Sequence, residues 1–397
     1  MPESGFAYFL NVASLVIIAF SVHLLILRSV KHAVYLPLAV CLSAVAVLLS
    51  QPVVKVLLPS FQVIFLLLSL PALYLIPPCF WLYVQGITSE TSWQFTRAHR
   101  KHFILSGVAG LIVVSALLLP SDIRHQLLVI GNDRVLESTA TWLRYGVYGL
   151  LILTFMLVLG WVVQAGFYIQ AAWRLLQVYR QQLRNVFAST ETQEARWIGW
   201  IILMVSSLWL MVAASIVYDN LIAPVTIEPV FKNVVALVLI WSVAVWGLRQ
   251  KPGFETLYQQ KETDISDTLT AGANEKYQRS ALNKTLCENI ERKLNHAMDH
   301  DQLFLDASLS LPKLASHIAS SANYISQTLN ETMGVNFFDY VNRYRVNAAK
   351  ERLLNTNETV IDIAMNTGFN AKSSFYTAFK KETNMTPSAY RKANKAG

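Results

Sequence analysis

Charged residues are scarce in this chain. Asp, Glu, Lys and Arg make up only 15% of its 397 residues and hydrophobic residues make up 54%, whereas soluble domains carry roughly 25% charged residues. Up to about Gln250 the charges lie between long apolar stretches, and the centres of these stretches contain none. This absence counts against an ion-coupled transporter or a proton pump, because such proteins need ionisable groups inside the membrane.

Cysteine is also rare, with three residues at Cys41, Cys79 and Cys287. Their wide separation gives neither a disulfide framework nor the paired spacing of a zinc site. The sequence also lacks a phosphate-binding Gly-rich loop, an HExxH motif and a GxSxG motif. We therefore expect no enzymatic activity, no cofactor and no metal site.

What the chain has instead is apolar sequence of membrane-spanning length. A hydrocarbon core of about 30 Å needs roughly 20 apolar residues per helix, and seven stretches approach that length. We expect an all-α protein in which residues 1–250 form a seven-helix transmembrane domain that acts as a sensor. The stretches are Phe6–Leu27, Ala33–Ser50, Phe61–Tyr83, Phe103–Leu119, Tyr145–Tyr168, Trp197–Tyr218 and Val234–Leu248.

The distribution of Lys and Arg predicts the orientation of these helices. With the N-terminus outside, the loops on the inner side carry eleven Lys and Arg residues and the loops on the outer side carry five. Cationic loops tend to stay in the cytoplasm. We therefore expect a multi-pass protein of the inner (cytoplasmic) membrane of a bacterium, with its N-terminus outside and its C-terminal domain in the cytoplasm.

Aromatic and polar side chains in these stretches are candidates for a membrane ligand pocket. Pro71, Pro77 and Pro78 remove helical hydrogen bonds from the third stretch, so we expect a kink or a cavity there. The candidate lining residues are Tyr74, Pro77, Trp161, Gln164, Trp209 and Trp241. Anchoring at the membrane interface and hydrogen bonding between helices explain most of them more simply.

The sequence becomes hydrophilic after the seventh stretch. Residues 251–275 scatter Gly, Thr and Asp without an apolar period, and we predict a flexible cytoplasmic linker. Residues 276–397 carry sixteen Lys and Arg against eleven Asp and Glu, a net charge of +5 that suits a polyanionic partner. Leu286, Ile290 and Leu294 follow helical spacing. This predicts a leading helix that packs on its own domain or contacts a second copy.

Two copies of one pattern lie within residues 276–397. In the second copy, Thr359 suits a helix N-cap and Gly368 suits the left-handed turn that ends a short helix. Phe375 and Phe379 then give a second helix its buried face. The first copy has Ser310, Leu311, Leu314, Ala315, Ala319, Ile325 and Leu329 at corresponding positions. Both copies indicate helix-turn-helix motifs, over about residues 310–332 and 359–382.

A longer helix is predicted between the two copies, over about residues 336–356. Its length of roughly 30 Å at 1.5 Å per residue is close to the roughly 34 Å between successive major grooves on one face of B-DNA. One chain therefore has the dimensions to contact two adjacent groove segments.

Residues 310–392 resemble the tandem helix-turn-helix DNA-binding domain of the AraC/XylS family of transcriptional regulators, and the run GFNAKSSFYTAFKKETNMTPSAYR is the most specific signature. The resemblance implies base contacts from the second helix of each pair. The matching positions are Asn323, Ser326 and Gln327 in the first pair and Lys372, Ser373, Tyr376 and Thr377 in the second. Lys380 and Lys381 are candidates for phosphate contacts.

Two positions depart from the family pattern. Thr377 stands where an arginine is common, so the base preference is not readable. Asn384 replaces the usual glycine of the turn after this helix, and Asn also tolerates a left-handed conformation. The fold is therefore expected to be preserved.

Together these patterns predict a membrane-bound, one-component transcription regulator that couples a membrane or extracytoplasmic signal to sequence-specific promoter binding. The expected partners are double-stranded DNA, membrane lipid, a small apolar or amphipathic ligand, a second copy in a homodimer, and RNA polymerase if the protein is an activator. Two alternatives stay open. One is a small-molecule transporter or channel with a DNA-binding regulatory tail, and the other is a regulator anchored passively in the membrane without sensing.

Overall fold

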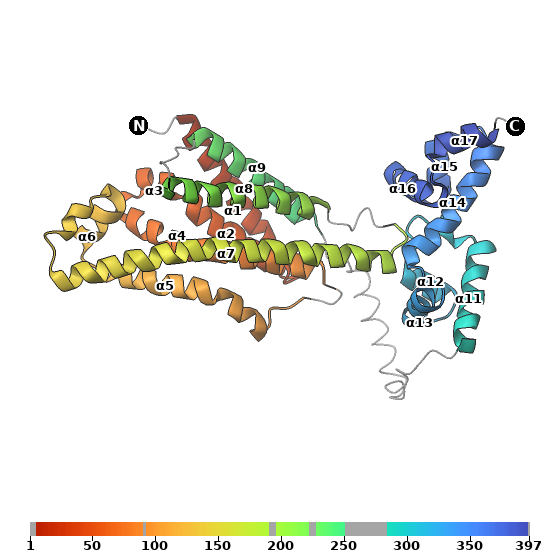
Figure 1. Ribbon diagram of the computed structural model, residues 1–397, viewed down its shortest axis with the longest axis horizontal. Helices are drawn as coiled ribbons and strands as arrows, with labels where there is room; N and C mark the ends of the chain where they lie inside the picture. Colours follow the sequence, from red (N-terminus) through yellow and green to blue (C-terminus); the bar gives the residue numbers. More distant parts are fainter. Residues whose placement is uncertain (1–4, 90–92, 190–195, 222–227, 251–283, 396–397) are drawn as a thin grey trace. The chain divides into compact units, whose positions relative to one another are not determined.

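The computed structural model describes residues 5–89, 93–189, 196–221, 228–250 and 284–395. These residues form helices and turns, and the described part of the chain contains no β-strand beyond one isolated antiparallel bridge between Phe187 and Ser310. The chain divides into two compact units (Figure 1). The first unit is Met1–Leu176 with Arg196–Glu255, and the second unit is Gln177–Ala195 with Thr256–Gly397. The predicted linker at residues 251–275 lies outside the described residues.

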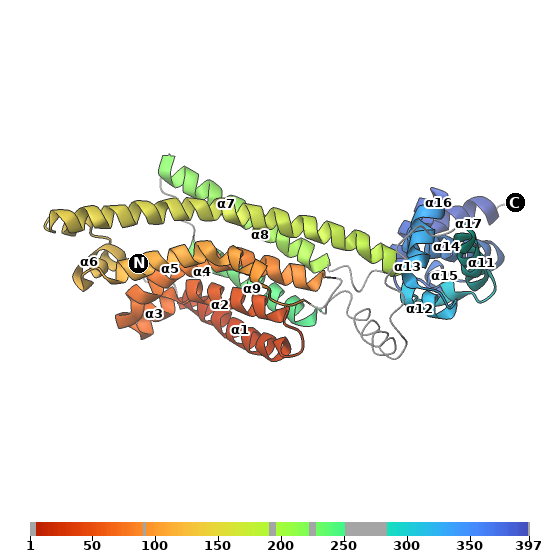
Figure 2. The same ribbon diagram turned by 90° about the horizontal axis from the view of Figure 1, so that it is seen from below.

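The first unit consists of apolar helices. They are α1 (Gly5–Ser29), α2 (Tyr35–Leu49), α3 (Gln51–Leu57), α4 (Gln62–Ile87), α5 (Ile104–Leu117), α6 (Ser121–His125), the first part of α7 (Thr141–Val186), α8 (Arg196–Leu221) and α9 (Pro229–Arg249). Figure 2 shows α1, α2, α4 and α5 running alongside one another. Helix α2 packs against both α1 and α4, and α9 packs against α1.

Several of these helices are long and apolar enough to cross a membrane. Among the described residues five helices meet this criterion, or six if α2 and α3, which meet at a bend of 55°, form one span. The part of α8 that enters this comparison, Ile198–Ser207, is apolar but shorter. The predicted count of seven spans therefore stays a prediction.

Helix α4 continues through its three prolines. It runs without a break from Gln62 to Ile87 with Pro71, Pro77 and Pro78 inside. Neighbouring side chains bond carbonyls of this segment, because Ser106 Oγ donates to the Pro71 carbonyl over 3.0 Å and Cys41 Sγ donates to the Ile76 carbonyl over 3.7 Å. These two carbonyls are not the ones that the prolines leave without a helical donor, which are those of Leu67, Leu73 and Tyr74.

Helix α7 is much longer than the predicted stretch Tyr145–Tyr168. It has 46 residues, whereas about 20 suffice to cross a membrane. Residues up to Leu176 belong to the first unit and the turns from Gln177 onward belong to the second. One helix therefore contributes to both units.

Large apolar side chains remain exposed on the outer faces of the first unit. Phe20, Leu111 and Val163 are 64%, 68% and 73% exposed. Many other large apolar side chains of these helices are also exposed, whereas water-soluble proteins rarely expose large apolar surfaces. The exposed apolar faces are those expected of helices that contact lipid.

The second unit is built from short helices around one long one. They are α11 (Lys284–Asp299), α12 (Leu311–His317), α13 (Ala322–Gln327), α14 (Phe337–Asn355), α15 (Val360–Asn366), α16 (Lys372–Thr383) and α17 (Pro387–Lys395). Helix α14 joins two hydrophobic clusters. Its N-terminal half, with Phe337, Tyr340 and Val341, packs with α11, α12 and α13. Its C-terminal half, with Ala349 and Leu353, packs with α15 and α16.

The turns within the second unit have the conformations that the sequence indicates. Thr359 Oγ1 accepts from the Asp362 amide over 3.1 Å and caps α15. Gly368 has a φ of 88°, and Ala319 at the corresponding position of the first pair has a φ of 48°. Asn384 has a φ of 55°, the left-handed conformation expected of a residue in place of glycine.

Candidate nucleic-acid interface

Helix α16 separates an apolar face from a polar one. Phe375 and Phe379 are completely buried in the cluster shared with α14 and α15. Lys372, Ser373 and Thr377 are exposed on the remaining face. The helix therefore presents a cation and two hydroxyl groups to solvent, which are groups that can bond base edges or phosphates.

Contacts along α16 organise this polar face. Lys372 Nζ lies 5.4 Å from the ring centroid of Tyr376, which is itself half-buried. Thr377 Oγ1 donates to the Ser373 carbonyl over 2.9 Å, so the lone pairs of the Thr377 hydroxyl point outward as acceptors. All four predicted base-contact residues of the second pair thus lie on one helix.

Helix α13 offers a smaller polar face. Asn323 is exposed, whereas Ser326 and Gln327 are half-buried. The Gln327 amide donates to Glu331 Oε2 over 2.8 Å, and Ser326 Oγ accepts from the Asn330 amide over 3.3 Å. Two of the three predicted residues are therefore held by neighbours one turn further along the chain.

The two phosphate-contact candidates differ in their surroundings. Lys381 Nζ lies 2.7 Å from Asp339 Oδ1 at the start of α14. Lys380 is exposed in the last turn of α16. Because a carboxylate partly neutralises Lys381, Lys380 is the better candidate for a phosphate.

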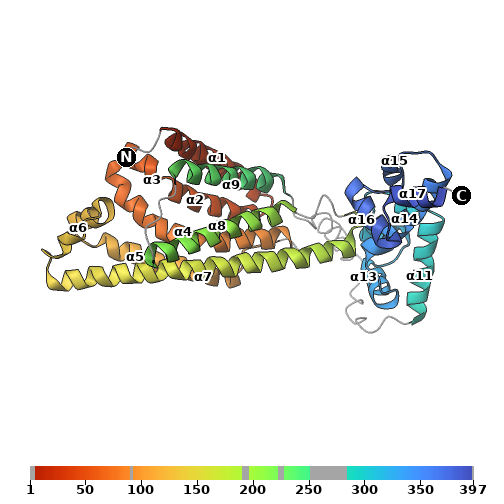
Figure 3. The ribbon, with the colours of Figure 1, turned by 45° about the horizontal axis from the view of Figure 1, so that its top comes forward.

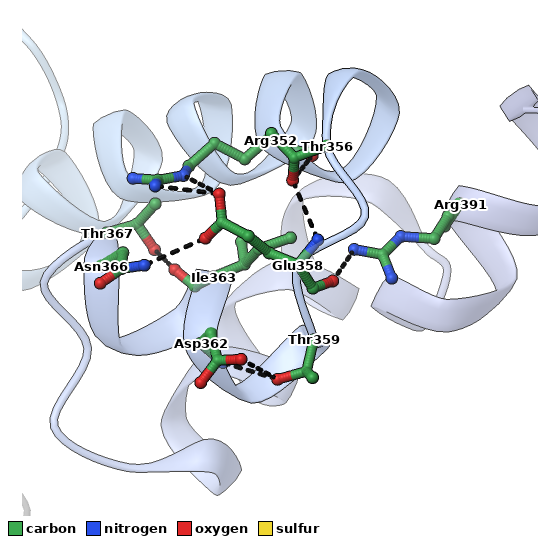
Figure 4. A network of polar contacts seen from close by, with 9 residues as sticks. All are labelled: Arg352, Thr356, Glu358, Thr359, Asp362, Ile363, Asn366, Thr367 and Arg391. Atoms are coloured by element: carbon green, nitrogen blue, oxygen red, sulfur yellow. Dashed lines mark hydrogen bonds and ion pairs between the residues drawn. The ribbon is translucent and has the colours of Figure 1, made fainter.

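A polar network fixes the second helix pair on α14 (Figure 4). Glu358 Oε1 accepts from Arg352 Nη2 over 3.0 Å, and Glu358 Oε2 accepts from the side-chain Nδ2 of Asn366 over 3.0 Å. Arg391 of α17 donates to the Glu358 carbonyl over 2.7 Å and to the Leu353 carbonyl over 3.2 Å. Helices α14, α15 and α17 are therefore joined at one residue.

The network also changes the acidity of its carboxylate. The hydrogen bond from Asn366 and then that from Arg352 hold the pKa of Glu358 below its ordinary value, against a smaller opposing effect of burial. Hydrogen bonds to the charged form lower a carboxyl pKa because they stabilise that form. Glu358 is therefore ionised in the folded second unit at neutral pH.

Arg345 of α14 is a residue that the sequence reasoning missed. Its side chain is completely buried. Nε donates to the Phe304 carbonyl over 2.8 Å, and Nη2 donates to the Asp306 carbonyl over 2.9 Å. Its guanidinium also lies 5.6 Å from the ring centroid of Phe369, in the turn before α16. A signal was present, since Arg345 lies four residues after Val341 and four before Ala349, on the buried face of the helix.

A cavity of about 350 Å³ lies in the first unit between α2, α4, α7, α8 and α9. Of the predicted lining residues, Pro77, Trp161 and Trp209 line it. Tyr74 instead donates its hydroxyl to the Leu157 carbonyl. Gln164 is buried and does not line the cavity, and Trp241 is 59% exposed.

The lining of the cavity is apolar, and the indole N–H groups of its two tryptophans are not directed at a ligand. Trp209 Nε1 donates to the Val162 carbonyl over 3.0 Å. Trp161 Nε1 is buried and has no hydrogen-bond partner among the described residues. An apolar ligand fits such a lining.

The cysteines and other potential metal ligands form no cluster in the described part of the chain. Cys41, Cys79 and Cys287 are each buried and unpaired thiols. The described residues contain no group of three or more His, Cys, Asp or Glu that could hold a metal ion.

Comparison with known proteins finds a match within the second unit. Residues 314–393 match the family model described as a helix-turn-helix domain. The C-terminal part of the chain is an AraC-type helix-turn-helix domain. A domain of this type binds double-stranded DNA and belongs to transcription regulators.

Two similar proteins each match a quarter of the chain or less. An uncharacterised HTH-type transcriptional regulator of Staphylococcus aureus strain COL is 36% identical over 99 residues, which are 25% of this chain and 13% of that protein. The melibiose operon regulatory protein of Escherichia coli K12 is 32% identical over 87 residues, which are 22% of this chain and 29% of that protein. The chain thus covers less than a third of either relative.

Among solved structures, the C-terminal domain of the two-component response regulator yesN of Fusobacterium nucleatum is 30% identical. The match covers 26% of this chain and 98% of that domain, with a TM-score of 0.24.

Proposed function

We propose that the chain is a membrane-bound, one-component regulator that binds promoter DNA through two helix-turn-helix motifs, α12–α13 and α15–α16, in response to a signal received by the first unit. The observation that carries the DNA-binding part is the face of α16, where Lys372, Ser373 and Thr377 are exposed opposite the buried Phe375 and Phe379. Helix α14, with 19 residues, is about 28 Å long. This length supports binding to two successive major-groove segments.

The membrane placement rests on the apolar helices of the first unit. Seven spans, counted from five long helices, the α2–α3 pair and α8, put both ends of the first unit on opposite sides of the membrane. With the N-terminus outside, the eleven inner cations and the DNA-binding domain lie on the cytoplasmic side. The cytoplasmic membrane of a bacterium satisfies both conditions.

The cavity between α2, α4, α7, α8 and α9 is the proposed site of the signal. Its apolar lining suits a small apolar ligand or the apolar part of an amphipathic one. Of the predicted contacts, Pro77, Trp161 and Trp209 are the candidates at this lining, and Tyr74, Gln164 and Trp241 lie outside it. Pairing of two chains in a homodimer places four helix-turn-helix motifs on one operator.

The test uses the full chain in lipid nanodiscs and duplexes selected from a random library. We expect the wild-type chain to enrich one sequence class, and Lys372→Ala with Ser373→Ala to lose this preference while the protein remains folded. Recovery of random duplexes by the wild type contradicts the proposal.

A second experiment separates sensing from anchoring. The first unit is replaced by an unrelated single span, and transcription of a reporter behind the selected operator is compared in cells across growth conditions. We expect the replacement to abolish the response to conditions. An unchanged response assigns the first unit to passive anchoring.

A further inference from the structure

The segment that follows α7 is built into the second unit. Phe187 pairs with Ser310 in the isolated antiparallel bridge, and the Ala188 amide donates to the Leu309 carbonyl over 3.2 Å. Ala188 is 1% exposed and belongs to the hydrophobic cluster around α12 and α13. The chain just after α7 therefore lies against the first residue of the first helix pair.

Side chains of helix α14 also hydrogen-bond to this segment. Arg345 Nη1 donates to the Ala188 carbonyl over 3.2 Å and to Ser189 Oγ over 3.0 Å, and the Asn342 amide lies 3.5 Å from the Ala188 carbonyl. One turn back on α7, the Arg184 guanidinium lies 5.8 Å from the ring centroid of Phe338. A buried guanidinium needs acceptors for its N–H groups, so the docked segment satisfies part of that need.

The location of this contact matters for DNA binding. Figures 1 and 3 both show α13 and α16 on the same side of α14, with the last turns of α7 reaching α14 between them. A duplex that places successive major grooves on α13 and α16 passes its intervening minor groove and phosphate backbones across this same interval. The end of α7 and a duplex bound in this way therefore occupy the same surface of α14.

We propose that Gln177–Ser189, which are the end of α7 and the three residues after it, compete with duplex DNA for the surface of α14 between α13 and α16, so that the docked segment holds the protein in a state of weak DNA binding. The inference rests on the proposed function and adds its regulation. Trp161 and Tyr168 of the same helix line the cavity of the first unit. Ligand binding there acts on α7, and release of the α7 end then exposes the DNA-binding surface.

The first experiment locks the contact with a disulfide in the full chain in nanodiscs. In an antiparallel bridge of this kind the two residues form a non-hydrogen-bonded pair with side chains close together, a spacing that a disulfide accepts. Phe187→Cys with Ser310→Cys is oxidised with diamide, and the three native thiols are buried. Ser310 caps α12 without a side-chain hydrogen bond, so its replacement removes no capping bond.

We expect the oxidised double variant to bind the selected duplex at least about fivefold more weakly than the same protein after reduction. The single variants Phe187→Cys and Ser310→Cys are the controls and should not respond to diamide. Equal binding before and after reduction, with the cross-link verified by mass, overturns the inference.

The second experiment weakens the contact. Ala188→Pro removes the amide that bonds Leu309, while α7 already ends at Val186. We expect tighter binding of the duplex, by about fivefold or more, with hydrogen exchange of α14 unchanged. Gln181→Ala, at an exposed position of α7, is the control and should bind like the wild type.

The outcomes distinguish the two proposals. If the wild type selects a duplex and Ala188→Pro leaves its affinity unchanged, the inference is overturned and the proposed function stands. If the wild type, the reduced double-cysteine variant and Ala188→Pro all bind without preference for any duplex, the proposed function fails and the inference fails with it.

Discussion

Gly368 sets the turn between α15 and α16 with a backbone conformation that L side chains rarely adopt. Its φ is 88°, and an added Cβ would collide with the Phe304 carbonyl and lie 3.0 Å from Arg345 Nε. We expect Gly368→Ala to lower the free energy of unfolding of the second unit by about 2 kcal/mol or more. Urea unfolding of the full chain, followed by hydrogen exchange of α14 amides, measures this change.

Gly334 is the matched control for this prediction. It also has a positive φ, 67°, but no atom lies within 4 Å of an added Cβ. Gly334→Ala should therefore cost only about 1 kcal/mol from the backbone conformation. An equal loss of unfolding free energy in Gly368→Ala and Gly334→Ala would show that the space around Gly368 is not restricted.

Glu358 makes the stability of the second unit depend on pH. Its pKa is lowered by hydrogen bonds from Asn366 and Arg352, so its stabilising effect is present above the unfolded-state value of roughly 4.3 and is lost as pH falls through the lowered pKa. We expect Glu358→Gln to lower the unfolding temperature at neutral pH and to match the wild type in acid. Thermal unfolding across pH measures the difference.

Glu351 supplies the control for the pH experiment. It is exposed on α14 in the same part of the second unit. In Glu351→Gln, the difference in unfolding temperature between neutral and acidic pH should equal that of the wild type. A pH dependence that is the same in Glu358→Gln and the wild type contradicts the role of this carboxylate.

At the scale of one helix, α16 carries two kinds of contact that experiments can separate. Ser373→Ala should reduce discrimination at one base position by about 1–3 kcal/mol without a uniform loss of affinity. Lys380→Ala should weaken binding to all duplexes and lower the salt dependence of binding by about one released counterion. Lys381→Ala should have a smaller effect, because Asp339 already pairs with this lysine. Binding titrations at several salt concentrations measure all three.

The helices of the second unit follow from local sequence signals. The capping oxygen of Thr359, the positive φ of Gly368 and the spacing of Phe375 and Phe379 are each properties of a few neighbouring residues, and the structure has them where the pattern predicts. The identities of the base contacts depend on a duplex and stay a prediction.

The length of α7 shows what local reasoning overlooked. The prediction ended the helix at Tyr168, where the apolar stretch ends, but no Gly or Pro occurs between Phe167 and Arg196. Nothing in the sequence stops the helix there, and it continues to Val186. Apolar patterning marks the membrane-spanning part of a helix, whereas breakers mark its end.

At the scale of the whole molecule, membrane orientation is the property most open to test. We introduce Ser138→Cys, exposed after η4 (Asp133–Leu136), and separately Glu382→Cys, exposed on α16. A membrane-impermeant maleimide should label Ser138→Cys in intact cells and Glu382→Cys only after lysis. The buried native thiols keep the background low. Labelling of Glu382→Cys in intact cells contradicts a cytoplasmic C-terminus.

The composition of the second unit from two separate stretches was not predictable from sequence. Phe187 and Ser310 are 123 positions apart in the numbering, and a hydrophobic pattern identifies a face to be buried without identifying its partner. Arg345 likewise follows helical spacing, but its acceptors at Ala188 and Ser189 come from elsewhere in the chain. Pairings of this kind depend on tertiary structure.

The discontinuous second unit also affects biosynthesis. Residues 184–189 leave the ribosome early, whereas α12 and α14, which contact them, are synthesised after α8 and α9. Domains generally fold as units during synthesis. The second unit therefore cannot fold until its C-terminal helices have been synthesised, and its N-terminal segment is exposed until then. A nascent chain halted before α14 therefore presents Phe187 and Ala188 uncovered, as a target for chaperones and proteases.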